Sequence, residues 1–520
     1  MYQYLWDAET GGLLLTSEIS KFSKEPRPVY YRELDILGFD AYWSYTRDDS
    51  APIMWAEANN YIYRGRKIAS TKGGSLYTKP ELIIIEESPE PNNAPLIPVD
   101  VAEMCRRNAD LMEMLVQETI QKIYNTYMKY RERIDVFYVA FSGGKDSVVT
   151  LDLVQRALPH DQFKVLFGDT QMEFPDTYDL VNTIKEECEK SKIEFLISKS
   201  DKKPIETWRE FGPPAQKMRW CCSVHKTAPQ ILLLRKILGK PRFTGFAFVG
   251  VRADESITRS KYEEINLGAK HRGQYDFYPI LNWSSAEVYL YIFSNHLLLN
   301  DTYRKGNSRA GCLVCPSEAD KNSWFKSQSY SSCDGCDRCY TTSFFHDIIL
   351  DTTIAKTLPQ ESQREFMDYG VWTSRHNGKK LAVQRNYYHD EYKDGIFKAT
   401  IDCARSDWRE WLKTIGEISI QNDHEVMIMY RGISYTLIYH QHDEKVDFVI
   451  KGLTNRQDEI YLLSLIKNVL RKSAYCIRCR VCEANCPFGY ISMSEGKVSI
   501  SDNCIHCQKC HSVDKGCLVA

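Results

Sequence analysis

The stretch that decides the fold is residues 134–147, Ile134-Asp-Val-Phe-Tyr-Val-Ala-Phe-Ser142-Gly-Gly-Lys-Asp-Ser147. Residues 134–141 are an apolar, β-branched and aromatic run, which predicts a buried parallel strand, and a helical pattern follows the turn 142–147. Two adjacent glycines let successive N–H groups face one point at the positive end of that helix. The turn is not a Walker A loop, because the four residues that separate the glycines there are missing. We therefore predict a different phosphate-binding turn, in which Lys145 adds a mobile positive charge.

The composition describes a globular protein of several domains. Its 520 residues exceed a single core, so we expect three or four domains. A net charge of −2 gives no general attraction to nucleic acid. No apolar run reaches the roughly 18 residues of a bilayer span, and the N-terminus lacks the pattern of a signal peptide. We therefore expect a cytoplasmic protein with no membrane partner.

The predicted fold class is α/β, with smaller domains around a parallel-sheet core whose Ser142–Ser147 turn resembles the PP-loop of adenine nucleotide α-hydrolase-like proteins. Alternating apolar strands and helical stretches predict the parallel sheet, whose ligands bind at the carboxyl ends of the strands. A proline-rich stretch at 87–99 predicts a linker, and Asp100 can cap a long helix from residue 101 to about 132. The predicted parts are a β-rich domain (1–86), a linker and helix (87–133), the nucleotide domain (134–325), a Cys-containing helical or irregular region (326–395), a small α+β domain (396–472) and a ferredoxin-like module (473–520).

Polar side chains follow two further predicted strands of the nucleotide domain. The strand 163–167 leads to Asp169, and the strand 246–251 leads to Arg252. Asp169 can hold Mg²⁺ or a ribose hydroxyl through its carboxylate oxygens, or it can cap a helix. Arg252 and Arg259 offer forked donors for phosphate or sulfate oxygens, although each alone can be a surface charge.

Five motifs occur in order: SGGKDS at 142–147, GDTQMEFPDTY at 168–178, GVRADESITR at 250–259, YPILNW at 278–283 and RAGCLVC at 309–315. In this order they resemble the phosphoadenosine phosphosulfate reductase family, a branch of the PP-loop superfamily whose members cleave ATP to AMP and pyrophosphate. The resemblance implies catalytic roles for Lys145, Asp169 and Arg252. It implies nucleotide contacts by Ser142, Gly143, Gly144, Lys145, Asp146, Ser147, Asp169, Thr170, Arg252, Arg259 and Arg309.

The 18 cysteines favour metal or cluster ligation, because disulfides are improbable in a large protein without an export signal. The pairs Cys221-Cys222 and Cys312-x2-Cys315 resemble the ligands of the [4Fe–4S] cluster in iron–sulfur adenylylsulfate reductases. Four thiolates can also hold Zn²⁺. A possible extra site comprises Cys333, Cys336 and Cys339, completed by His346 or another residue.

The last 48 residues carry the strongest metal signal. The run Cys476-x2-Cys479-x2-Cys482-x3-Cys486-Pro487 is that of bacterial ferredoxins, in which the fourth Cys ligates the other cluster. Resemblance to two-cluster ferredoxins implies one [4Fe–4S] cluster on Cys476, Cys479, Cys482 and Cys517, and another on Cys486, Cys504, Cys507 and Cys510. The gap from Cys510 to Cys517 is longer than the usual three residues, and zinc is the alternative metal.

The complete SGGKDS resembles that of the ATP-hydrolysing members of the superfamily, which act in DNA phosphorothioation or tRNA thiolation. This resemblance favours an iron–sulfur ATP pyrophosphatase that adenylates a substrate for sulfur insertion. The expected cofactors are ATP, Mg²⁺ and [4Fe–4S] clusters, with electrons relayed by the clusters. The expected partners are an adenine nucleotide, a DNA or tRNA acceptor, a cysteine desulfurase as sulfur donor, and an electron donor. A nucleic acid would need a local basic footprint, for which the candidates are Lys202-Lys203, Lys217, Arg219 and Arg235-Lys236.

Two other functions stay open. The first is a sulfonucleotide reductase that turns adenylylsulfate or its 3′-phosphorylated form into sulfite. Such reductases use a tail cysteine in a Glu-Cys-Gly-x-His context, whereas the last cysteine here lies in Lys515-Gly516-Cys517-Leu518. The second is a nucleotide-sensing component of a defence complex, for which we would expect the loss of Lys145 or Asp169.

Overall fold

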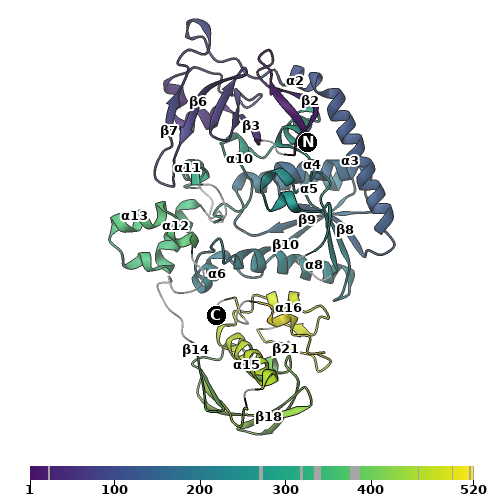
Figure 1. The fold of residues 1–520 in the computed structure, drawn as a ribbon, viewed down its shortest axis with the longest axis vertical. Helices are drawn as coiled ribbons and strands as arrows, with labels where there is room; N and C mark the ends of the chain where they lie inside the picture. The colour runs from purple at the N-terminus through teal and green to yellow at the C-terminus, as the bar shows by residue number, and fades with distance from the viewer. Residues whose placement is uncertain are drawn as a thin grey trace. The chain divides into compact units, whose positions relative to one another are not determined.

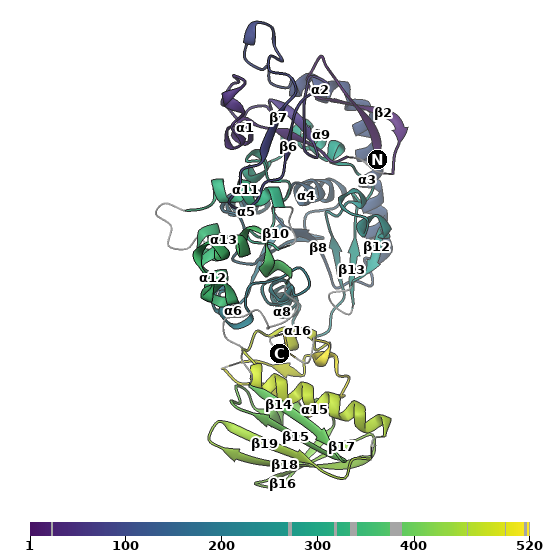
Figure 2. The same cartoon turned by 60° about the vertical axis from the view of Figure 1, so that its left-hand side comes forward.

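In the computed structural model, the described residues are 1–520 without 22–23, 269–272, 317–319, 333–340, 375–386, 455, 495, 514–516 and 519–520. Contacts divide the chain into two compact units, each described here by itself (Figures 1 and 2). Unit 1 comprises 1–198, 243–347 and 360–371, and unit 2 comprises 199–242, 348–359 and 372–520. Of the described helices, none combines the length and the apolar character needed to cross a bilayer. The boundaries between the six predicted parts stay predictions.

The core of unit 1 is a six-stranded sheet with the strand order β10-β9-β8-β11-β13-β12. β8 pairs in parallel with β9 and with β11, and β11 pairs in parallel with β13. β12 is antiparallel to β13, which the sequence did not predict. The α/β class with a parallel-sheet core is thereby confirmed. The bounds are β8 (Val136–Phe141), β9 (Lys164–Asp169), β10 (Glu194–Lys199), β11 (Gly245–Phe248), β12 (Ile265–Leu267) and β13 (Gln274–Phe277).

β8 is buried along nearly its whole length, because neighbouring strands and helices cover it. α4 packs on β8, and α3 packs along α4 (Figure 1). Val139 of β8 and Val149 of α4 are both fully buried in the same core. The helices of this layer are α3 (Ala109–Tyr130), α4 (Lys145–Ala157), α5 (Pro175–Lys190), α9 (Ser285–Ser294) and α10 (Asp301–Arg304).

The long helix predicted from residue 101 is divided into two. Asp100 does cap it, accepting from the backbone N–H of Glu103 at 3.0 Å. Asn108 then separates α2 (Val101–Arg107) from α3, because its buried side chain binds β2 instead of solvent. Its Nδ2 donates to the carbonyl of Leu13 at 2.9 Å, and its Oδ1 accepts from the N–H of Leu15 at 2.7 Å.

The first part of unit 1 is built from short antiparallel strands. β1 (Tyr2–Trp6) pairs with β2 (Leu13–Ile19). A five-stranded sheet follows in chain order, and its strands are β3 (Pro26–Val29), β4 (Met54–Glu57), β5 (Asn60–Tyr63), β6 (Arg66–Lys72) and β7 (Glu81–Ile84). The remaining helices of this unit are α1 (Tyr31–Leu37), α11 (Asp320–Ser329) and α13 (Gln360–Asp368), while α12 (Thr342–Thr352) begins in it.

Unit 2 contains a six-stranded antiparallel sheet in the order β14-β15-β19-β18-β17-β16. Figure 2 shows α15 (Gln457–Tyr475) lying along one face of this sheet, and Trp408 and Trp411 of α14 (Trp408–Leu412) are buried in the same core. The strands are β14 (Tyr388–Lys393), β15 (Ile396–Ile401), β16 (Glu417–Asn422), β17 (Glu425–Tyr430), β18 (Ile433–His442) and β19 (Lys445–Ile450).

The rest of unit 2 holds two cysteine-bearing segments. The first is one continuous helical stretch, which consists of α7 (Trp220–Cys222), a turn of π-helix (Ser223–Thr227) and α8 (Ala228–Leu238), and α6 (Pro204–Phe211) precedes it. The second follows α15 and contains α16 (Val481–Asn485), β20 (Ile491–Ser492) and β21 (Ser499–Ile500). α16 packs against α8.

Candidate functional site

The predicted phosphate-binding turn connects the end of β8 to the start of α4. Gly143 has a φ of +72°, and a Cβ there would lie 2.7 Å from Cγ2 of Thr177. Both the backbone conformation and the lack of space therefore disfavour a side chain at this position. The hydroxyl of Ser147 donates to the carbonyl of Gly144 at 2.8 Å and accepts from the N–H of Ser142 at 3.2 Å. The two serines that flank the glycines therefore hold the turn closed.

Two residues that the sequence analysis did not select support this turn from outside. The hydroxyl of Tyr303 accepts from the backbone N–H of Lys145 at 3.2 Å and from that of Ala310 at 3.3 Å. Nδ2 of Asn300 donates to the carbonyl of Gly143 at 3.0 Å. Tyr303 lies six residues before Arg309, so its nearness to a selected motif was the available signal.

Two positive side chains converge on Asp146 in the first turn of α4. Nζ of Lys145 lies 2.9 Å from Oδ2 of Asp146, and Nε of Arg252 lies 2.7 Å from Oδ1. Burial alone would raise the pKa of Asp146, but the two cations outweigh it and lower the pKa to about 2. Burial would also lower the pKa of Lys145, and the charge of Asp146 reverses that direction. Asp146 therefore favours the charged form of Lys145 and pairs with the guanidinium of Arg252 beside the turn.

Arg252 is 1% exposed and has a second acidic partner. Its Nη2 lies 2.9 Å from Oε1 of Glu25, the residue directly before β3. The carboxylate of Asp254 is farther away, 3.9 Å from Nη1. Glu25 lies in the predicted β-rich domain, far from the nucleotide motifs in sequence, and no sequence signal connected it with them.

Gly250 sets the position of Arg252 relative to the turn. A Cβ at Gly250 would lie 2.5 Å from the backbone oxygen of Asp146 and 3.0 Å from the backbone nitrogen of Ser147. The absence of a side chain therefore lets the chain after β11 approach the first turn of α4.

Asp169 is the last residue of β9, at the carboxyl edge of the sheet. Its Oδ1 accepts from the backbone N–H of Gln171 at 2.8 Å and from the hydroxyl of Tyr178 at 2.9 Å. The alternative role of Asp169 as a helix cap is wrong, because the N-cap of α5 is Phe174. The hydroxyl of the next residue, Thr170, donates to Glu173 at 2.7 Å.

The two other arginines of the predicted site lie differently. Arg259 is 27% exposed and pairs with Glu255. Arg309 is exposed. Their predicted role at the phosphates stays a prediction.

The four core cysteines belong to different units. Cys312 is in unit 1, where its sulfur lies 3.5 Å from the hydroxyl of Thr170, and Cys315 follows three residues later. Cys221 and Cys222 end α7 in unit 2. A shared cluster stays a prediction, as does the extra site, since Cys333, Cys336 and Cys339 lie outside the described residues.

Within unit 2, neighbouring C-terminal cysteines change the pKa of one another's thiols. Burial, and then the charges of Cys482, Cys517 and Cys476, raise the pKa of the Cys479 thiol. These are the four residues predicted to hold the first cluster. In the second predicted set, Cys486 and Cys507 add to burial in raising the pKa of Cys504, and Cys510 is buried in the same core as Cys486. No three His, Cys, Asp or Glu side chains of the described residues form a ready site for a metal ion.

A buried lysine lies among these thiols. Lys472, in the last turn of α15, donates from Nζ to Sγ of Cys482 at 3.0 Å. Burial would lower its pKa, but the charges of Cys482, Cys517 and Cys510 raise it instead. The sequence analysis missed Lys472, because it precedes the cysteine motif and belongs to an ordinary amphipathic helix.

Arg235 of α8 is an anchor for the cysteine segment. Its guanidinium donates to the carbonyls of Glu483 at 2.9 Å, Ala484 at 3.0 Å and Cys486 at 2.7 Å. Its predicted place in a basic nucleic-acid footprint is therefore wrong, because the side chain is buried against α16. Lys203, Lys217, Arg219 and Lys236 are exposed.

Residues 136–318 match the family model of the phosphoadenosine phosphosulfate reductase domain. Two uncharacterized proteins of Methanocaldococcus jannaschii are 34% and 32% identical over 214 and 216 residues, about 41% and 42% of this chain. The match spans only 42% and 50% of those proteins, about half their length.

A shorter relative is matched over most of its length. The adenosine 5′-phosphosulfate reductase of Geobacillus kaustophilus is 30% identical over 195 residues, which are 36% of this chain and 77% of that enzyme. Residues 136–318, which match the family model, contain the turn, Asp169, Arg252 and both core cysteine pairs. The chain therefore belongs to the phosphoadenosine phosphosulfate reductase family.

Proposed function

We propose that this protein binds ATP at the 142–147 turn and transfers its AMP group to an acceptor oxygen, which activates the acceptor for sulfur insertion. The observation that carries the proposal is the convergence of Lys145 and Arg252 on Asp146 at the start of α4. A helix N-terminus with two buried cations suits the charge of a triphosphate.

The reaction would proceed by displacement at the α-phosphorus. The acceptor oxygen forms a bond to that phosphorus, the bond to the bridging oxygen breaks, and pyrophosphate leaves with the electron pair. Lys145, Arg252 and the backbone N–H groups of the turn stabilise the charge that develops on pyrophosphate. Asp169 offers a carboxylate for Mg²⁺, which neutralises phosphate charge when bound.

We further propose that the C-terminal segment holds two [4Fe–4S] clusters on the two predicted sets of cysteines. The ferredoxin-type spacing of these cysteines, and the buried ammonium of Lys472 beside Cys482, support this proposal. Thiolate-bound clusters are anionic and would match that buried cation. The clusters would supply electrons for sulfur chemistry on a DNA or tRNA acceptor, with a cysteine desulfurase as sulfur donor.

The relatives favour a second candidate function. The relative from Geobacillus kaustophilus is named adenosine 5′-phosphosulfate reductase, which points to the reduction of adenylylsulfate to AMP and sulfite. A nucleotide-sensing role is the third candidate. All three functions use an adenine nucleotide at the same turn, so product analysis distinguishes them.

The test is product analysis of protein purified without oxygen. One sample receives ATP and Mg²⁺, and another receives adenylylsulfate and a reductant. AMP and pyrophosphate from ATP, lost in Lys145→Ala and kept in the control Lys190→Ala at the exposed end of α5, support the proposal. Sulfite from adenylylsulfate establishes the reductase instead. Tight ATP binding without either product, with candidate acceptors present, favours the sensing role.

A further inference from the structure

Lys472 is a buried lysine of unit 2 that contacts Cys482, a predicted cluster ligand. It is 1% exposed, and its ammonium lies 5.1 Å from the ring centre of Trp411 and 3.0 Å from Sγ of Cys482. An ammonium has three N–H donors. In the described part of the chain, these donors make one hydrogen bond, to the sulfur of Cys482.

The position of Lys472 relates it to the first predicted set of cysteines. Its contact, Cys482, belongs to that set. Lys472 is contributed by α15, the helix that covers the antiparallel sheet, and not by the ferredoxin-like run itself. The helix thus delivers a fixed positive charge to the cysteine segment.

We propose that Lys472 is a positioning residue that raises the reduction potential of the cluster ligated by Cys482. The inference rests on the iron–sulfur part of the proposed function. On reduction, a bound cluster would take up one electron from the electron donor, and its net charge would become more negative by one beside the Lys472 side chain. A nearby ammonium stabilises the reduced form more than the oxidised form, and its hydrogen bond to the sulfur acts in the same direction.

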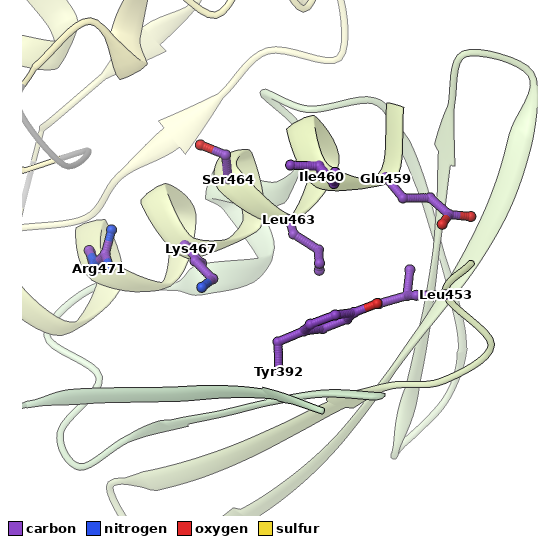
Figure 3. Close-up of a pocket in the computed structure, with 8 residues that line it drawn as sticks. All are labelled: Tyr392, Leu453, Glu459, Ile460, Leu463, Ser464, Lys467 and Arg471. Carbon is purple, nitrogen blue, oxygen red and sulfur yellow. The ribbon is translucent and has the colours of Figure 1, made fainter. Parts of the chain in front are cut away.

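The test compares the full-length protein with three variants, all with clusters reconstituted under anaerobic conditions. Lys472→Met removes the charge and the hydrogen bond, and Lys472→Arg keeps both. Lys467→Met is the matched control on the same helix, because Lys467 is paired with Asp390 and borders a cavity of about 340 Å³ with Tyr392 and Leu463 (Figure 3). Iron and sulfide are measured first, and the reduced clusters are then followed by electron paramagnetic resonance during a dithionite titration.

The expected result is that one titration step of Lys472→Met moves to lower potential. We expect at least a tenfold fall in the ratio of reduced to oxidised cluster at a fixed potential, which is about 59 mV for a one-electron couple. Lys472→Arg and Lys467→Met should stay close to the wild type. If Lys472→Met does not incorporate iron, Lys472→Gln replaces it, since it is polar, of similar length and uncharged.

Three results would overturn the inference, and they differ from one another. A wild-type protein that binds no iron–sulfur cluster refutes the iron–sulfur part of the proposed function, and the inference with it. A wild-type protein with clusters whose potentials are unchanged in the Lys472 variants refutes the inference alone. A shift of equal size in Lys467→Met would also overturn it, because any charge on α15 would then have the same effect.

Discussion

Replacing Gly250 by alanine tests how the nucleotide site is assembled. The added Cβ would lie 2.5 Å and 2.6 Å from the backbone oxygen and carbon of Asp146, and 3.0 Å from the backbone nitrogen of Ser147. Carbon atoms in good contact are about 3.5 Å apart, so the chain after β11 and the first turn of α4 must separate by roughly 1 Å. Backbone atoms cannot rotate away as a side chain can, so the phosphate-binding turn itself must move.

We expect Gly250→Ala to lower the free energy of unfolding by about 1–3 kcal/mol, the usual cost of overpacking. A displacement of 1 Å at a catalytic group lowers the rate about 100-fold. Denaturant unfolding gives the first quantity. Calorimetric titration with ATP and the rate of pyrophosphate release give the second.

The matched control is Gly245→Ala, five residues earlier at the start of β11. Its Cβ would meet Oε1 of Gln274 at 2.6 Å, the end of a flexible side chain that can rotate away. Nucleotide binding should therefore survive in this variant. If Gly250→Ala binds ATP within twofold of the wild type, the close approach does not position the turn and the reasoning is refuted.

Three further predictions concern charged side chains, namely Glu25, Asp146 and Arg235. Glu25→Gln removes a half-exposed anion that faces the buried Arg252, so ATP should bind more tightly by up to about fivefold; weaker binding in calorimetry would contradict this. Asp146 has a pKa of about 2 in the fold, below its unfolded value of 3.8, so its stabilising effect is present above pH 4 and is lost as the pH falls toward 2. The difference in unfolding free energy between the wild type and Asp146→Asn should therefore shrink over that window. Arg235→Met leaves three carbonyls without their donor and should destabilise unit 2 by at least about 2 kcal/mol, whereas the exposed Lys236→Met should not; equal urea midpoints for the two variants would refute the anchor.

The sequence by itself determined the central strand, the turn and the following helix. A strand buried on both faces must be apolar along its length, and a turn of this kind requires glycine where φ is positive, so residues 134–147 carry the information locally. The five ordered motifs also indicated the family, by their resemblance to its known motifs. The edge strand β12 and the break at Asn108 were missed, because each depends on a partner strand distant in sequence.

Only the tertiary structure decided which charges meet. Glu25 and Arg252 are 227 residues apart, yet their side chains pair, and no local pattern can encode such a contact. Arg235 looked like a surface cation until its three carbonyl acceptors were known, and Lys472 looked like the end of an amphipathic helix until Cys482 was placed beside it. The spacing of apolar residues in the sequence indicates which face of a helix or strand is apolar. The partner of a buried charge is fixed by how the elements pack, which is why these residues emerge only from the folded chain.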